Sequence, residues 1–169
     1  DACGHNDYNV IIWIVAIYTY SWWKIIEVFN ATAQLVSSSL NVVGNIIIQP
    51  GKTFNANGLN LSLGGNWIDE GNFLGGNTVT FNGSGAQEIT RTGGESFTNL
   101  SVSKPVGSLS LNNPVTVNNT LALTQGTLAV GNNLLILNGN VSGGGILTSD
   151  LLSTVNYNQS SSGQNVLSG

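Results

Sequence analysis

The sequence predicts an all-β protein folded as a right-handed parallel β-helix (β-solenoid), with short strands and turns rich in Gly and Asn. Short runs of alternating apolar and polar residues fill the chain from residue 35 onward, which is typical of half-buried strands. Turn residues, among them 22 Gly, interrupt these runs every few positions. A long internal repeat relates two parts of the chain, which favours stacked coils over a β-sandwich.

The repeat is clearest between residues 79–87 and 155–164. Each copy has a valine, an aromatic residue two positions on, an Asn, and a Gly/Ser-rich turn that ends in Gln. The copies lie about 75 residues apart, and their spacing drifts only beside turn residues. We therefore expect a solenoid over residues 31–169 that contains two drifting repeats, about 36–102 and 111–169.

Equivalent positions in the two copies should have equivalent surroundings. Phe81 and Tyr157 occupy the same place in the two motifs, so we expect both rings to fill the core. Asn recurs at the predicted turns, where it tolerates the left-handed conformation and its side-chain amides can stack along the solenoid axis. These are Asn55, Asn57, Asn82, Asn112, Asn113, Asn118, Asn119, Asn132, Asn133, Asn138 and Asn140.

Residues 1–30 differ from the rest: a polar tip is followed by an apolar, aromatic segment. A strand that is apolar on both faces suits its β-branched and aromatic residues, and must be covered by its own coils or by another subunit. A membrane anchor is a third interpretation, although the apolar run is shorter than a spanning helix requires. We predict that this segment pairs with another subunit through Val10, Ile12, Trp13, Ile14, Tyr18, Tyr20, Trp22 and Trp23.

The charge content is low, at 7% of residues, with a net charge of −4. The chain has no basic patch to neutralise phosphates, which argues against nucleic acid as a partner. The second motif stops in mid-pattern, so we expect either a section of a longer array or a subunit whose ends are completed by neighbours.

Short strand-and-turn motifs recur at residues 61–67, 71–73, 79–84 with Gln87, 97–102 and 127–137. Together these segments resemble the secreted, adhesin-like β-solenoid repeat proteins of Bacteroidetes-type bacteria, which are often exported by the type IX route. The resemblance covers residues 36–169 and implies a β-solenoid with an extracellular or cell-surface location. It supplies no catalytic residues.

Carboxylates are the first candidates for catalysis, since glycan-cleaving enzymes gather two or three of them on one face. The candidates are Asp69, Glu70, Glu88, Glu95 and Asp150. Asp69 and Glu70 are adjacent, so on a strand they point to opposite faces, and a surface turn is the preferred interpretation. Cys3, His5 and Asp7 alternate near the start, but without a second cluster they do not predict a metal site. We expect no catalytic residues, no cofactor and no metal.

The leading hypothesis is therefore a structural, non-enzymatic protein of the extracellular space or cell surface. Its expected partners are copies of itself, joined end to end in a filament or along a longer adhesin. A carbohydrate-binding adhesin module is the alternative, with Trp67 as a possible glycan contact. A β-helical glycan lyase or hydrolase is a third hypothesis, and the membrane would be reached only through residues 1–30.

Overall fold

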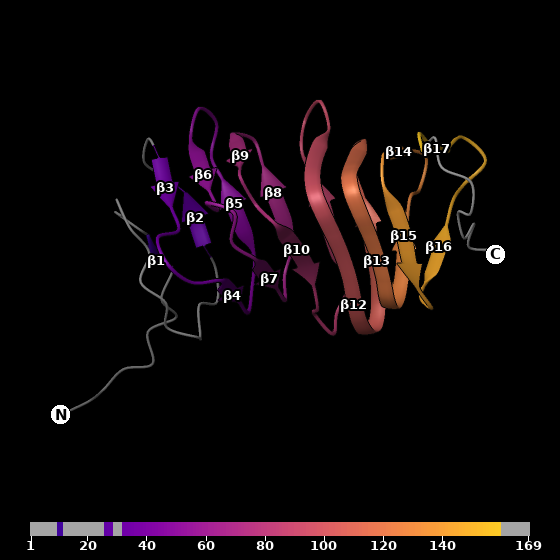
Figure 1. Cartoon of the computed structure of the whole chain (residues 1–169), viewed down its shortest axis with the longest axis horizontal. Coiled ribbons are helices and arrows are strands. Elements are labelled where there is room, and N and C mark those ends of the chain that lie inside the picture. Colours follow the sequence, from indigo (N-terminus) through magenta and orange to yellow (C-terminus); the bar gives the residue numbers. More distant parts are fainter. Residues whose placement is uncertain (1–9, 12–25, 29–31, 160–169) are drawn as a thin grey trace.

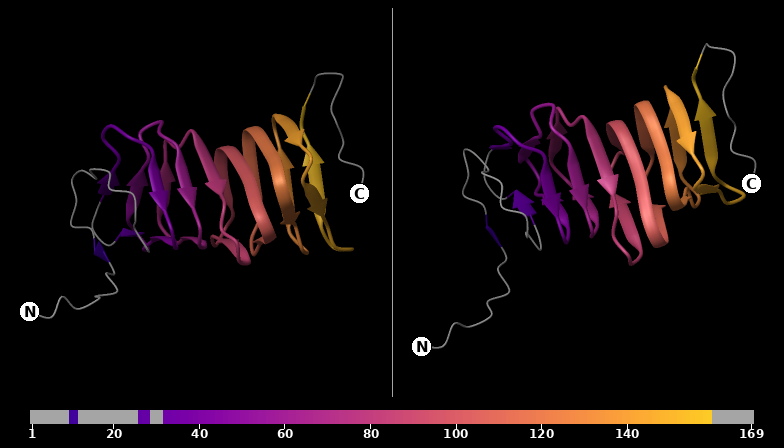
Figure 2. Two further views of the ribbon diagram at one scale, coloured as in Figure 1. Left: turned by 90° about the horizontal axis from the view of Figure 1, so that it is seen from below. Right: turned by 60° about the horizontal axis from the view of Figure 1, so that its bottom comes forward.

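The computed structural model confirms the β-solenoid: parallel strands stack in coils along one axis (Figure 1). The structure describes residues 10–11, 26–28 and 32–159, and these contain strands and turns but no helix. No helix in this part of the chain is long and apolar enough to span a membrane. The first and last strands lie at opposite ends of the stack (Figure 2).

Each coil contributes one short segment to each of three faces. Face 1 contains β1 (Val10–Ile11), β2 (Ile26–Val28), β5 (Ile46–Ile48), β8 (Trp67–Asp69), β11 (Gln87–Thr90) and β16 (Ile146–Thr148). Face 2 contains β4 (Leu40–Val42), β7 (Leu61–Leu63), β10 (Thr78–Phe81) and β15 (Asn140–Gly143). Face 3 contains β3 (Thr32–Gln34), β6 (Thr53–Asn55), β9 (Asn72–Leu74), β14 (Leu134–Leu137) and β17 (Thr154–Tyr157).

Two long strands, β12 (Glu95–Leu111) and β13 (Val115–Ala129), run through all three faces in turn. Turn residues at positions such as Gly107 and Asn118 predicted separate short strands here. The chain instead stays extended around the corners, and the β12–β13 pairing shifts register after Phe97, Val102 and Ser103. Such irregularities bend a strand without ending it.

The core consists of inward side chains stacked in ladders. On face 2 one ladder runs Leu40, Leu61, Val79, Leu100 and Leu121, each at most 2% exposed. Alternate residues of each strand point inward, so the period-2 pattern of the sequence becomes an apolar interior and a polar surface. Each fully buried aliphatic side chain contributes about 1.5–3 kcal/mol to folding.

The repeat of about 75 residues matches strands but does not contain a whole number of coils. Paired residues lie from 16 positions apart, for Val10 and Ile26, to 22 apart, for Trp67 and Ile89. Val79 therefore lies on face 2, whereas its counterpart Val155 lies on face 3. The expectation that matched residues hold equivalent places is wrong, because the repeat shifts each strand to another face.

The prediction that both motif aromatics fill the core is confirmed for one ring and only partly for the other. Phe81 is fully buried, as expected. Tyr157 is only partly buried against the core, since it belongs to β17, which pairs with β14 alone among the described strands. The prediction for Asn at turns is confirmed at Asn57, which has a φ of 52°.

Candidate functional site

Among the residues that the structure describes, four polar side chains lie inside the solenoid: Asp69, Gln87, Glu95 and Lys104. All four are at most 3% exposed and come from the central coils. Buried polar groups need hydrogen-bond or charge partners, and these four divide into two clusters. Asp69 and Glu95 lie where the chain passes from face 1 to face 3, and Gln87 and Lys104 lie where it passes from face 2 to face 1.

In the first cluster, Trp67 and Arg91 hold Glu95. The Trp67 indole Nε1 donates a hydrogen bond of 2.7 Å to Glu95 Oε2. Arg91 Nη1 lies 3.4 Å from Glu95 Oε1, which also accepts the Ser96 amide at 2.8 Å. Both oxygens of a buried carboxylate are thereby satisfied.

Asp69 is the second carboxylate that contacts Arg91. It takes the inward position that Val28 and Ile48 hold in the preceding coils. Its Oδ1 accepts the Gly71 amide at 2.8 Å, and its Oδ2 has only the Arg91 Nε, 3.6 Å away. Arg91 also donates to the Gly71 carbonyl at 3.1 Å. One arginine thus lies between two buried carboxylates.

Burial raises the pKa of Glu95 to about 7. The nearby Asp69 carboxylate raises it further, whereas the hydrogen bonds from Ser96 and Trp67 and the charge of Arg91 oppose the rise. Glu95 therefore exchanges its proton near neutral pH.

In the second cluster, the Lys104 ammonium is surrounded by oxygen atoms. Nζ donates to the carbonyls of Gly83 and Gly85, each at 2.8 Å, and to Gln87 Oε1 at 2.7 Å. Among the described residues no carboxylate forms an ion pair with Lys104. Burial lowers the pKa of this ammonium, because desolvation disfavours the charged form. We name Lys104 Nζ and these three oxygens the ammonium cage.

The surface carries ladders of asparagine amides along the axis, as the sequence predicted. Asn138 donates to Asn118 at 3.2 Å, and Asn158 donates to Asn138 at 3.1 Å. A second ladder runs from Asn119 to Asn99 at 2.8 Å and from Asn99 to Asn77 at 3.0 Å. Each ladder joins successive coils by hydrogen bonds between identical side chains.

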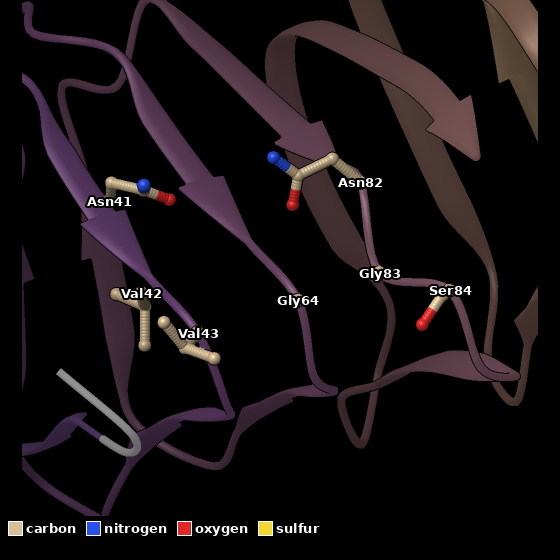
Figure 3. Close-up of a pocket in the computed structure, with 7 residues that line it drawn as sticks. All are labelled: Asn41, Val42, Val43, Gly64, Asn82, Gly83 and Ser84. Atoms are coloured by element: carbon tan, nitrogen blue, oxygen red, sulfur yellow. The ribbon is translucent and has the colours of Figure 1, made fainter. Parts of the chain in front are cut away.

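A shallow groove of about 320 Å³ crosses three successive coils on the outer surface. Its lining comes from residues at or just after the ends of β4, β7 and β10: Asn41, Val42, Val43, Gly64, Asn82, Gly83 and Ser84. Figure 3 shows the amides of Asn41 and Asn82 on opposite sides of the segment that ends at Gly64. Gly64 has no side chain to fill the space, and Val43 adds an exposed apolar surface (53% exposed).

The structure brings together only two of the five candidate carboxylates, Asp69 and Glu95. Glu70, Glu88 and Asp150 are exposed at the surface. The surface-turn interpretation is correct for Glu70 and wrong for Asp69, which is fully buried because its strand turns that residue inward. The described part of the chain contains no group of three metal-ligating residues, and Cys3, His5 and Asp7 lie outside it.

Trp67 cannot serve as the glycan contact that the sequence suggested. Its side chain is fully buried, and its ring packs edge-on against Phe73 and Phe97 at centroid distances of 4.7 and 5.5 Å. The prediction required an exposed ring, but Trp67 takes the inward place that Ile46 holds one coil earlier.

The predicted assembly residues lie mostly outside the described part of the chain. These are Ile12, Trp13, Ile14, Tyr18, Tyr20, Trp22 and Trp23. Val10 belongs to β1, whose backbone pairs in parallel with β2 of the same chain. Pairing between subunits therefore remains a prediction for this segment.

Sequence reasoning missed the ammonium cage and the carboxylate–arginine cluster. A signal was present in both cases: Gln87 closes the motif 79–87, and Lys104 and Arg91 are two of only four cations. The sequence could not predict the strand register, which places the members of each cluster in adjacent coils. No family model, curated protein or solved structure matches this chain.

Proposed function

We propose that this chain is a structural, non-enzymatic β-solenoid protein of the extracellular space or cell surface. In this proposal copies of the chain join end to end, as filament subunits or as segments of a longer adhesin. Four observations support the proposal: an open strand edge, matching edges at the two ends, a surface with few charges, and buried carboxylates engaged in structural contacts.

The open edge at β15, β16 and β17 is the observation that carries the proposal. Each of these strands pairs on one side only within the described chain: β15 and β16 with β13, and β17 with β14. Their inward side chains are partly exposed, whereas the residues one coil earlier are buried. The pairs are Val141 over Leu121, Leu147 over Leu128, and Val155 over Leu135.

Backbone groups at this edge point away from the solenoid. Thr154 and Asn158 donate their amides to carbonyls of the coil below, at 3.0 and 2.9 Å. Successive residues of a strand in a parallel ladder bond to opposite neighbours, so the amides of Val155 and Tyr157 point to the free side. An edge of this kind is a template for a further strand.

The opposite end offers edges on the same faces. Among the described residues β4 on face 2 pairs only with β7, and β3 on face 3 pairs only with β6. All strands run in parallel, so a second copy displaced along the axis continues each face without reversing it. Such a head-to-tail contact is heterologous and generates an open filament rather than a closed dimer.

The surface and the interior both suit a structural role. Amide ladders and hydroxyls form the outer surface, in keeping with the low charge content and with an extracellular location. Inside, Glu95 accepts hydrogen bonds from Trp67 and Ser96, and Asp69 pairs with Arg91. Their contacts support stabilisation of the coils in preference to glycan cleavage.

The test places lysines on the free edge. The exposed Thr154 and Asn156 of β17 are replaced in a T154K/N156K variant, because edge lysines block strand addition. The control is T98K, because Thr98 is also exposed but lies in β12, a strand that pairs with neighbours on both sides. We expect filaments from the wild type and T98K, and short rods from T154K/N156K, by negative-stain electron microscopy and sedimentation velocity. Equal filaments from all three proteins, or none from the wild type, would contradict the proposal.

The groove favours carbohydrate binding as a second candidate function. Asn41, Asn82 and Ser84 offer donors and acceptors to sugar hydroxyls, and Val43 offers an apolar contact. A glycan array probed with the wild type, N82A and the exposed-turn control N132A tests this. Binding that is lost only in N82A supports the candidate, and an array without hits removes it.

A further inference from the structure

We propose that the corner formed by Gly83, Gly85 and Gln87 is a monovalent-cation site, and that the Lys104 ammonium is its tethered occupant. Without the lysine, the same oxygens would bind a small primary ammonium ion. The inference concerns the interior of the solenoid and does not depend on end-to-end assembly.

Donors and acceptors match in number at this site. A lysine ammonium has three N–H donors, and Nζ has three oxygen acceptors within 2.8 Å. A neutral amine has only two N–H groups, so it could donate to only two of these three oxygens. The geometry is therefore that of a cation surrounded by oxygens rather than of an amine in an apolar pocket.

The Gln87 amide is held so that its oxygen faces Lys104. Its Nε2 donates to the carbonyls of Leu63, at 3.1 Å, and of Gly65 in the preceding coil. Its Oε1 accepts the Gly83 amide at 2.9 Å as well as Lys104 Nζ. Rotating the amide by half a turn would break all of these bonds, so the oxygen is oriented before any cation arrives.

Neutral dipoles, and no carboxylate, compensate the charge. Two backbone carbonyls and one amide oxygen replace the hydration shell of the ammonium, as carbonyl oxygens do for K⁺ in a channel filter. The arrangement is closed, because Lys104 is 0% exposed. These are the features of a dehydrated site for a monovalent cation.

Glycines around this corner leave room for the lysine and bring the next coil close. A Cβ on Gly83 would lie 2.0 Å from the Gly64 carbonyl oxygen, and one on Gly126 would lie 2.8 Å from the Lys104 carbonyl oxygen. Larger residues at these positions would push the coils apart. Lys104 thereby connects its own coil to the Gly83–Gln87 turn, and Gln87 connects that turn to Leu63 and Gly65.

Chemical rescue tests the proposal. In K104A the cage oxygens remain and the space of the side chain opens, so the melting temperature should fall on the order of 5 °C or more. Ethylammonium chloride should then raise the melting temperature of K104A with a saturable concentration dependence. Tetramethylammonium chloride at the same concentration has no N–H donor and should not. The wild type should respond equally to both salts.

The contrasting variant is K104M, whose side chain fills the space without a charge. It should be destabilised and should show no ethylammonium-specific gain. A K104A protein that responds equally to both salts, or a K104M protein as stable as the wild type, would overturn the proposal.

A measurement on the unmodified protein keeps the proposal testable if K104A does not fold. In ¹⁵N–¹H spectra at neutral pH, a protonated Lys104 Nζ shielded from water should give a slowly exchanging NH₃⁺ signal with quartet nitrogen coupling. The signal should be absent from K104M. A neutral-amine triplet, or no protected lysine signal, would refute the assignment.

Discussion

Trp67 Nε1 and Glu95 Oε2 are joined by a hydrogen bond of 2.7 Å inside the solenoid. The two residues come from adjacent coils, since Trp67 belongs to β8 and Glu95 begins β12. The bond fixes the only described Trp in the interior and gives Glu95 a partner that stays in place at every pH. An aromatic residue that the sequence suggested as a glycan contact is therefore a structural donor.

Replacing Trp67 by Phe should destabilise the protein, because Glu95 Oε2 would lose its donor while remaining buried. The expected loss is about 1–3 kcal/mol of unfolding free energy, measured by urea denaturation. The loss should be larger above pH 7, where Glu95 is ionised. The control V106A alters an exposed side chain and should have little effect. An equal loss at pH 5 and pH 8 would contradict the role of the Glu95 charge.

The raised pKa of Glu95 predicts a pH dependence of stability. The folded state holds this proton more tightly than the unfolded state, so the free energy of unfolding falls as pH rises from about 4.5 to about 7. The full change is up to about 3 kcal/mol. E95Q should remove this component, whereas E88Q, at an exposed position, should keep it. Urea titrations of the three proteins at several pH values measure it, and parallel profiles for the wild type and E95Q would refute it.

Removing Arg91 should leave Asp69 as an uncompensated buried charge. We expect R91A to lose about 3–5 kcal/mol, the usual cost of breaking a buried pair from one side. In D69N/R91A the charge is gone, so part of this loss should return. A double variant less stable than R91A would show that the Arg91–Asp69 charge pair is not the cause.

Two glycines of the cage corner form a matched pair for substitution. The carbonyl oxygens of both glycines accept a hydrogen bond from Lys104 Nζ. A Cβ on Gly83 would lie 2.0 Å from the Gly64 carbonyl oxygen, whereas one on Gly85 meets nothing within 4 Å. G83A should therefore lose more than about 2 kcal/mol of unfolding free energy, and G85A should stay within about 0.5 kcal/mol of the wild type. Similar losses in both variants would mean that coil spacing does not limit this corner.

The asparagine ladders should contribute modestly, because they lie at the surface. Asn138 bonds to both Asn118 and Asn158, so N138A should cost about 1 kcal/mol. Asn132 lies on an exposed turn outside this ladder, and N132A is the control. Chemical denaturation distinguishes the two, and equal stabilities would show that the ladder contributes nothing.

The sequence by itself determined the fold class and the character of the surface. Alternation of apolar and polar residues fixed which side chains of each strand point inward, as in the ladder from Leu40 to Leu121. Asn at turns predicted both the left-handed Asn57 and the amide ladders. These properties are local, because they depend on neighbours within one strand or turn.

Only the tertiary structure decided how the strands combine. The register of each coil placed Val79 and Val155 on different faces, turned Trp67 and Asp69 inward, and brought Lys104 to Gln87. Differences of one or two residues in turn length set this register, and these differences add up along the chain. Partners that lie 16 to 22 residues apart are therefore fixed by the packing of whole coils, not by any pattern within one of them.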